Sequence, residues 1–113
     1  MLTKPPITGT DNFRQRVIHI IAAIPYGCVV TYGDVARLAG SVRASRQVGG
    51  IMKNLPPGSL LPWHRVINRK GEISLTGADR ERQKSALLAE GIIFTDEGKI
   101  DLEIFRWRYE SAQ

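Results

Sequence analysis

The apolar residues near the start of the chain recur at intervals of three and four residues, which is the spacing of a helix. Five of them fall on one helical face: Phe13, Val17, Ile20, Ile21 and Ile24. Thr10 or Asp11 can cap the start of this helix, and Pro25 ends it. Residues 1–9, which contain two prolines and a glycine, are predicted to form a flexible leader.

Two shorter helices follow, joined by a turn that contains a glycine. Residues 28–30 are predicted to be extended. Thr31 and Asp34 then form a capping box, in which each side chain accepts a hydrogen bond from the backbone amide of the other. Gly40 closes the first helix in the left-handed conformation, and the second helix is predicted over about residues 44–53. Two short helices in this arrangement are typical of a helix-turn-helix.

Short strands, turns and one more helix are predicted for the second half of the chain. In order, the segments are a loop (54–61), a strand, a turn and a returning strand (64–67, 68–71 and 72–74), a small-residue loop that could cover a pocket (75–78), a helix (79–90), two apolar segments (92–94 and 100–102) around a turn (96–99), and a tail (103–113). The helix directs Ala86, Leu87 and Leu88 inward, and Gly91 closes it. The chain is therefore predicted to be one domain, 1–113, that is mainly α-helical with a small β element.

The length and composition are those of one globular domain. The chain has 113 residues, of which 42% are hydrophobic and 24% are charged, which is ordinary for a soluble protein with one core. The first residues lack the layout of a signal peptide, and no apolar run is long enough to cross a bilayer, so we expect a cytoplasmic protein without a membrane partner. The single cysteine, Cys28, excludes an intramolecular disulfide, and two histidines argue against a zinc site. No cofactor or metal is expected.

Positive charge is concentrated in the middle of the chain. Residues 35–71 contain seven basic residues and no acidic one, whereas the rest of the chain holds nine basic and eleven acidic residues. Arginines outnumber lysines by eleven to five, and guanidinium groups suit bidentate contacts with phosphates and bases. A merely solubilising surface does not predict this segregation, so the pattern favours nucleic-acid binding.

The second helix of the helix-turn-helix contains two adjacent glycines, Gly49 and Gly50. Each costs about 1 kcal/mol relative to alanine in a helix interior, so we expect another backbone to approach the helix closely. The basic neighbours Arg43, Arg46 and Lys53 favour a nucleic-acid backbone. Close packing against another helix is the alternative.

Residues 62–66, Pro-Trp-His-Arg-Val, place an indole beside an imidazole at the entrance to a strand, which suggests a lined pocket. With three other stretches, this segment resembles the DNA-binding, active-site domain of the O6-alkylguanine-DNA alkyltransferases. The stretches are 24–27 with 30–34 (IPYG and VTYGD), 45–50 (SRQVGG), 61–67 (LPWHRVI) and 87–91 (LLAEG). They occur in the family's order and with similar spacing over about residues 13–91. The resemblance implies a winged-helix-like helix-turn-helix domain.

Trp63 departs from the family pattern. The signature of these enzymes is Pro-Cys-His-Arg-Val, and its cysteine thiolate takes the alkyl group from guanine, whereas an indole offers only an N–H donor. The chain is therefore similar to the alkyltransferase-like proteins, the subfamily with tryptophan at this place. That resemblance implies a monomer without catalytic residues, which binds O6-alkylguanine in double-stranded DNA through the minor groove and extrudes the nucleotide. It also implies that the bound complex, associated with the nucleoid, flags the lesion for nucleotide excision repair proteins.

The resemblance further implies roles for single residues. Tyr32 corresponds to the tyrosine that crowds the 3′ phosphate, and Arg46 to the arginine finger that enters the base stack. His64 and Glu90 correspond to the pair that activates the cysteine, and with Arg65 they are expected to support the pocket. The residues implied for the pocket are Tyr32, Trp63, His64, Val66, Leu75, Thr76, Gly77 and Ala78, and those for DNA contact are Thr31, Tyr32, Arg43, Ser45, Arg46, Gln47, Gly49, Gly50 and Lys53.

Two other classes of function stay open. One is an enzyme, either an alkyltransferase that uses Cys28 or a hydrolase that uses His64, although the two residues are far apart in sequence. The other is a helix-turn-helix transcriptional regulator that reads the major groove of undamaged DNA. Sequence-specific binding to undamaged duplex favours the regulator, whereas a lesion reader prefers O6-alkylguanine in any flanking sequence.

Two local questions also stay open. The family's hinge asparagine aligns with Leu55 and lies one residue from Asn54, so that role is unassigned. The aromatic and basic residues at 105–109 could stack on nucleic acid or pack against the core.

Overall fold

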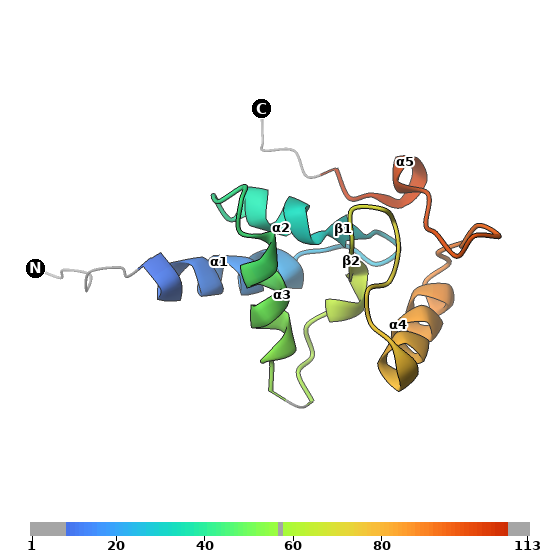
Figure 1. Ribbon diagram of the computed structural model, residues 1–113, viewed down its shortest axis with the longest axis horizontal. Helices are drawn as coiled ribbons and strands as arrows, with labels where there is room; N and C mark the ends of the chain where they lie inside the picture. The colour runs from blue at the N-terminus through green and yellow to red at the C-terminus, as the bar shows by residue number, and fades with distance from the viewer. Residues whose placement is uncertain (1–8, 57, 109–113) are drawn as a thin grey trace, which may run out of the picture.

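The computed structural model describes residues 9–56 and 58–108, and in them the chain is mainly helical with one small sheet (Figure 1). The elements are α1 (Gly9–Ala22), β1 (Val30–Thr31), α2 (Tyr32–Leu38), α3 (Ser45–Lys53), the 3₁₀ helix η1 (Trp63–Arg65), β2 (Val66–Ile67), α4 (Gly77–Ala89) and α5 (Leu102–Phe105). The predicted fold class is confirmed. Within the described ranges, no helix is both long enough and apolar enough to cross a membrane.

Helix α1 packs against α2 and α3 through the apolar face that the sequence spacing predicts. Phe13, Val17 and Ile21 are all buried on this face. Val35 of α2 and Val48 of α3 meet them in the same cluster. The helix-turn-helix therefore rests on α1 as its support.

The ends of α1 differ from the prediction. The helix already includes Gly9, the last residue of the predicted leader, while residues 1–8 lie outside the described part of the chain. It ends at Ala22 instead of continuing to Pro25, because the amides of Ala23 and Ile24 bond to carbonyls only three residues back. This tighter turn brings Ile24 into the core, where it is 2% exposed.

The predicted capping box is present at the start of α2. The Asp34 amide donates to Thr31 Oγ1 at 2.9 Å, and the Thr31 amide donates to the Asp34 carboxylate at 3.0 Å. Arg106 from the C-terminal segment also holds this carboxylate, through two hydrogen bonds of 2.6 and 3.0 Å. Burial raises the pKa of the Asp34 carboxyl, but the hydrogen bonds from Arg106 and Thr31 outweigh burial and keep the pKa below its ordinary value. Gly40, at φ 94°, closes the helix as expected.

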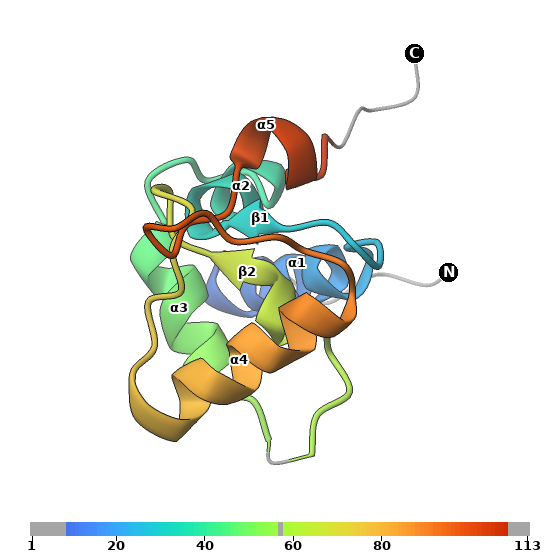
Figure 2. The same ribbon diagram turned by 90° about the vertical axis from the view of Figure 1, so that its right-hand side faces the viewer.

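The predicted hairpin over 64–74 is wrong. β2 pairs in parallel with β1, with Val30 opposite Val66, and residues 72–74 form no strand (Figure 2). Val66 and Ile67 are completely buried, as residues of a parallel pair are when both faces are covered. Asn68 then closes the turn with its side-chain carbonyl, which accepts from the amides of Lys70 and Glu72 at 2.9 Å each.

Helix α4 begins two residues earlier than predicted, so Gly77 and Ala78 belong to a helix and not to a loop. Its buried residues are Gln83 and Leu87, whereas Leu88, which was expected inside, is 50% exposed. The Gln83 amide donates to the carbonyls of His64 and Val66 at 3.0 Å each. A polar side chain thus fixes α4 onto η1 and β2, which a search for apolar positions does not reveal.

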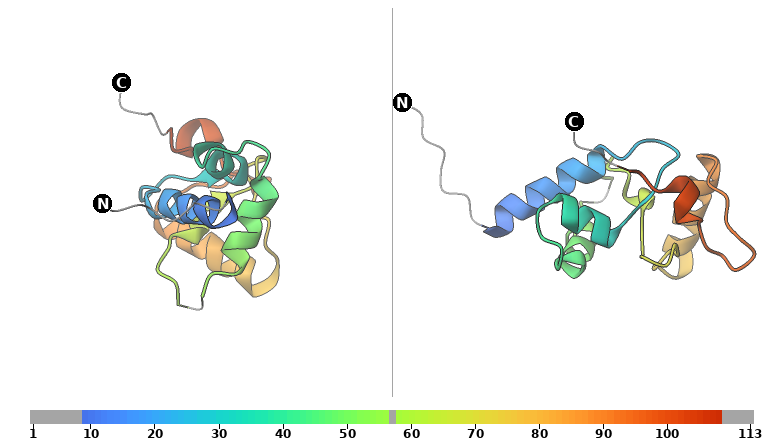
Figure 3. Two further views of the ribbon diagram at one scale, coloured as in Figure 1. Left: turned by 90° about the vertical axis from the view of Figure 1, so that its left-hand side faces the viewer. Right: turned by 90° about the horizontal axis from the view of Figure 1, so that it is seen from above.

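The C-terminal segment closes the far end of the domain, opposite the start of α1 (Figure 3). Phe94 and Ile100 form an antiparallel bridge around the predicted turn, and Val29 forms a parallel bridge with Arg106. Phe105 and Trp107 pack partly buried against the two core clusters. Of the two alternatives for these aromatic residues, stacking on nucleic acid or packing against the core, the structure shows packing against the core.

Candidate nucleic-acid interface and cavity

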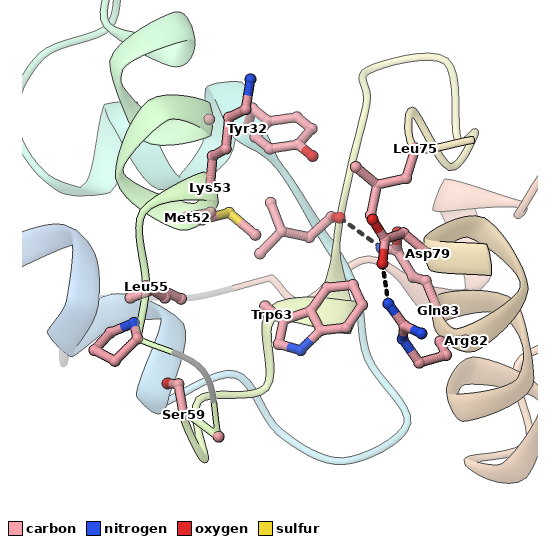
Figure 4. A pocket seen from close by; sticks show the side chains of 14 residues that line it. Tyr32, Met52, Lys53, Leu55, Ser59, Trp63, Leu75, Asp79, Arg82 and Gln83 are labelled. Atoms are coloured by element: carbon pink, nitrogen blue, oxygen red, sulfur yellow. Dashed lines mark hydrogen bonds and ion pairs between the residues drawn. The ribbon is translucent and has the colours of Figure 1, made fainter. Parts of the chain in front are cut away.

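A cavity of about 570 Å³ opens between the helix-turn-helix and α4 (Figure 4). Its walls come from the start of α2, the second half of α3, the loop that follows α3, η1 with β2, the loop before α4, and the first turns of α4. The lining residues are Tyr32, Gly49, Met52, Lys53, Leu55, Pro56, Gly58, Ser59, Trp63, Val66, Leu75, Asp79, Arg82 and Gln83. The cavity therefore lies between the helix-turn-helix and α4.

Trp63 forms one wall of the cavity. It begins the 3₁₀ turn η1 directly after Pro62, and its amide donates to the Leu61 carbonyl at 2.7 Å. The tight turn directs the indole into the cavity, between the α3 side and the α4 side (Figure 4). The neighbouring His64 ring lies perpendicular to the indole, with 6.3 Å between the ring centroids. Trp63 thus lines the cavity, whereas His64, the next residue of η1, does not.

His64 and Arg65 both bind Glu90, at the end of α4. His64 Nε2 lies 2.6 Å from Glu90 Oε2, and Arg65 donates from Nε and Nη2 to the same carboxylate at 2.7 to 3.0 Å. The Gly27 amide donates to Glu90 Oε1 at 2.8 Å, and Arg65 Nη1 also reaches the Ile24 carbonyl at 2.8 Å. We call Glu90, His64, Arg65 and the Gly27 amide the Glu90 network.

The Glu90 network has a strong electrostatic effect. The Glu90 side chain is only 6% exposed, and burial by itself raises its pKa. Hydrogen bonds from Arg65, the Gly27 amide and His64 outweigh burial and lower the pKa from 4.5 to about 2. The carboxylate is therefore ionised at neutral pH and ties η1, the end of α4 and the turn after α1 together.

The basic residues of the helix-turn-helix face solvent. The basic residues Arg43, Arg46 and Lys53 are exposed, as is the neutral Gln47, and Ser45 begins α3. A Cβ atom added at Gly49 or Gly50 would meet nothing within 4 Å among the described residues. Close helix packing, the alternative for this glycine pair, is therefore absent there, and the α3 backbone is open to an incoming partner.

Tyr32 lies where the helix-turn-helix meets the cavity. It is the first residue of α2, directly after the Thr31 cap, and its hydroxyl lies 3.1 Å from Ser74 Oγ. This contact links α2 to the loop before α4. Tyr32 therefore lies both on the cavity wall and beside the exposed face of the helix-turn-helix.

The structure brings together only part of the predicted pocket. Tyr32, Trp63, Val66 and Leu75 line the cavity, whereas His64, Thr76, Gly77 and Ala78 are not among its lining residues. His64 is engaged in the Glu90 network, and the other three are exposed at the start of α4. The lining residues that the sequence reasoning missed are Met52, Leu55, Pro56, Gly58, Ser59, Asp79, Arg82 and Gln83. The proline- and glycine-rich loop after α3 was a signal for some of them, but nothing indicated the α4 residues.

The structure also shows where the two hinge candidates and the single cysteine lie. Leu55 lines the cavity, whereas Asn54 follows α3 and donates from its side chain to the Gly50 carbonyl at 3.0 Å. Cys28 lies partly buried against the first core cluster and is not among the lining residues.

The comparisons with known proteins agree with this architecture. Residues 12–92 match the model of the 6-O-methylguanine DNA methyltransferase, DNA binding domain. The chain is 65% identical to a DNA base-flipping protein of Escherichia coli (strain K12), over 88% of this chain and 77% of that protein. It is 41% identical to the alkyltransferase-like protein 1 of Schizosaccharomyces pombe, over 87% of this chain and 96% of that protein. The chain therefore belongs to the 6-O-methylguanine DNA methyltransferase family, through its DNA-binding domain.

Solved structures show the same relationship. The crystal structure of S. pombe Atl1 in complex with damaged DNA containing O6-carboxymethylguanine matches with a TM-score of 0.78 and 41% identity, over 88% of this chain and 97% of that one. A methylated-DNA–protein-cysteine methyltransferase of Cricetulus griseus is 38% identical, but the match spans only 43% of its length. The chain is thus similar along nearly the whole length of Atl1 and along less than half of this methyltransferase.

Proposed function

We propose that this protein recognises O6-alkylguanine in duplex DNA without repairing it. In this proposal, α3 enters the minor groove, the damaged nucleotide rotates out of the helix, and the base occupies the cavity against Trp63. The observation that carries the proposal is the position of the Trp63 indole in the cavity wall beside the helix-turn-helix. By the resemblance set out above, this is the place of the cysteine that receives the alkyl group.

The absence of alkyl transfer follows from the chemistry of residue 63. An indole has an N–H donor and no lone pair suited to displacement at an alkyl carbon, whereas a thiolate is a good nucleophile. His64 and Glu90, the residues that would activate a thiol, are 2.6 Å apart and bound into a network with Arg65. Their proposed role here is to hold η1, and with it Trp63, in place.

Base flipping needs groups that offset the lost stacking and pairing. Extruding a base costs a few kcal/mol, and less when the base pairs poorly, as an O6-alkylated guanine does. We propose that Arg46, exposed on α3, fills the vacated space, while Tyr32 crowds the 3′ phosphate of the extruded nucleotide. The further DNA contacts that we propose are Thr31, Arg43, Ser45, Gln47, Gly49, Gly50 and Lys53.

The walls of the cavity suit a flipped purine with an alkyl substituent. Trp63 offers a stacking surface, and base stacking on an aromatic side chain is worth about 1–3 kcal/mol. Met52, Leu55, Val66 and Leu75 supply apolar surface, which favours an alkyl group by about 0.8 kcal/mol for each buried CH₂. Selectivity for the lesion is thus proposed to combine easier extrusion with a better fit of the substituent.

The relatives support the binding step in this proposal. One is named for base flipping, and the S. pombe protein is described in complex with damaged DNA. We further propose that the chain acts as a cytoplasmic monomer on the nucleoid, and that its DNA complex recruits nucleotide excision repair proteins. A repair assay in extracts with and without the excision proteins tests that last step.

A binding titration tests the central proposal. Three duplexes of the same sequence carry guanine, O6-methylguanine or a bulkier O6-alkylguanine at one position. We expect tighter binding to both lesions than to guanine, in more than one flanking sequence. Equal affinity for all three duplexes would contradict the proposal. Binding that follows the flanking sequence and ignores the lesion would also contradict it and would favour a transcriptional regulator.

A further inference from the structure

Three residues that line the cavity carry charge, and they give its walls a net positive charge of one. Lys53 extends from the end of α3, and Arg82 and Asp79 extend from the first turns of α4. Met52, Leu55, Trp63, Val66 and Leu75 are the apolar residues of the wall. A purine and an alkyl chain satisfy the apolar part. The N7 of the purine can accept a hydrogen bond from a cation, but a neutral alkyl chain gains nothing from one.

Within the described part of the chain, the interaction that holds Arg82 is a weak one that a ligand could share. Arg82 forms an ion pair with Asp79, three residues earlier on the same helix, and the two side chains are 66% and 59% exposed. Such exposed pairs are worth at most about 1 kcal/mol. A guanidinium carries five N–H donors in a planar fork, so Arg82 can keep Asp79 and still offer donors to a second carboxylate.

The position of Arg82 relative to Trp63 determines what it could contact. Both side chains line the cavity, and Figure 4 shows the guanidinium of Arg82 on the α4 side, next to the indole. Lys53 lies across the cavity on the α3 side. A base stacked on the indole would therefore place its edge substituents within the field of one or both cations.

We propose that Arg82 is a specificity-determining residue that selects for negative charge on the O6 substituent. Because it rests on the proposed function, the inference concerns which O6-alkylguanines are bound best. A substituent that ends in a carboxylate accepts hydrogen bonds from Arg82, and charge-assisted bonds of this kind are about twice as strong as neutral ones. Asp79 opposes the selection, since it competes for Arg82 and repels the incoming carboxylate.

A pair of isosteric adducts tests this charge selection. Duplexes that carry O6-carboxymethylguanine and O6-carbamoylmethylguanine differ by a carboxylate against a neutral amide of the same size. We expect the wild-type protein to bind the carboxylate adduct about fivefold more tightly, at fixed low salt and neutral pH. In Arg82→Gln the ratio of the two affinities falls to about one, whereas in Asp79→Asn it rises above the wild-type value.

Arg80→Gln is the matched control, since it removes the same charge from the same helix at a residue outside the cavity lining. It should leave the ratio of affinities unchanged. A wild-type ratio near one, or a ratio that Arg82→Gln leaves intact, overturns the inference. If Arg82→Gln weakens both adducts and plain guanine equally, Arg82 contacts phosphate, and the inference is again overturned while the proposed function stands. If neither adduct binds better than guanine, the proposed function fails as well.

Discussion

The two sides of Trp63 differ in how their polar groups are used. On one side, the Glu90 network is closed, because one carboxylate accepts from Arg65, His64 and the Gly27 amide and is almost completely buried. On the other side, the cavity is open and is lined by an indole, apolar side chains and the exposed pair Asp79 and Arg82. His64 and Glu90, which could activate a nucleophile, are therefore held in contacts that stabilise the fold. The groups that face the open cavity are suited to binding a ligand.

If the Glu90 network is structural, its loss should produce the largest effect on stability. Glu90→Gln leaves the Arg65 guanidinium, which is 15% exposed, without its charged partner. Breaking a buried pair in this way costs about 3–5 kcal/mol, which urea unfolding at neutral pH measures. Glu81→Gln, on the exposed face of the same helix, is the control and should change the free energy of unfolding by less than about 0.5 kcal/mol. An equally small effect of Glu90→Gln would show that the network is dispensable.

The same network predicts how stability depends on pH. The pKa of Glu90 is lowered from 4.5 to about 2, so its contribution is complete above 4.5 and is lost as the pH falls toward 2. Between pH 7 and pH 3 we expect a loss of about 2 kcal/mol from this group. The Asp34 carboxyl, whose pKa is also lowered, adds a loss in the same direction.

Urea unfolding at several pH values measures this loss, and Glu90→Gln should flatten the curve. A wild-type curve as flat as that of the variant would contradict the assignment of the shift to Glu90.

On the cavity side, Trp63→Ala should reduce binding and leave stability nearly intact. The indole is only partly buried, and its proposed contribution is stacking on the flipped base. Loss of about 2 kcal/mol corresponds to roughly thirtyfold weaker binding to an O6-methylguanine duplex. Binding to the unmodified duplex should change little, because its base is not extruded. An equal loss of affinity for both duplexes would show that Trp63 does not stack on the flipped base.

Arg46→Ala is expected to weaken binding less than Trp63→Ala does. This side chain is exposed on α3, so its removal should not alter the thermal midpoint. We expect roughly tenfold weaker binding to lesion DNA, from about 1.4 kcal/mol of lost insertion and charge. Lys84→Ala, a cation on α4 that lies over the Phe94 ring, is the control for loss of charge. Retained affinity in a gel-shift titration of Arg46→Ala would rule out the finger role.

Local signals predicted most of the fold. Helical spacing identified the face of α1, and the Thr31–Asp34 capping box identified the start of α2. Both depend on residues close in sequence. The parallel pairing of Val30 with Val66 spans 36 residues, and no local pattern distinguishes it from a hairpin when both strands are only two residues long.

The site was predicted less completely, for the same physical reason. Trp63, Val66 and Tyr32 were expected at the cavity because they lie in recognisable motifs. Asp79 and Arg82 were not, because they look like ordinary charges of an exposed helix and reach the cavity only through the docking of α4. That docking depends on Gln83, a polar residue whose burial the apolar pattern cannot reveal.

The most direct test of the central claim is the intact mass of the protein after incubation with an O6-methylguanine duplex. A methylated-DNA–protein-cysteine methyltransferase, incubated with the same duplex, serves as the positive control and gains one methyl group. We predict that this protein keeps its original mass while a titration on the same sample shows it bound to the lesion. A gain of one methyl group would contradict the account, because it would make the protein an enzyme with a nucleophile other than the residue at position 63.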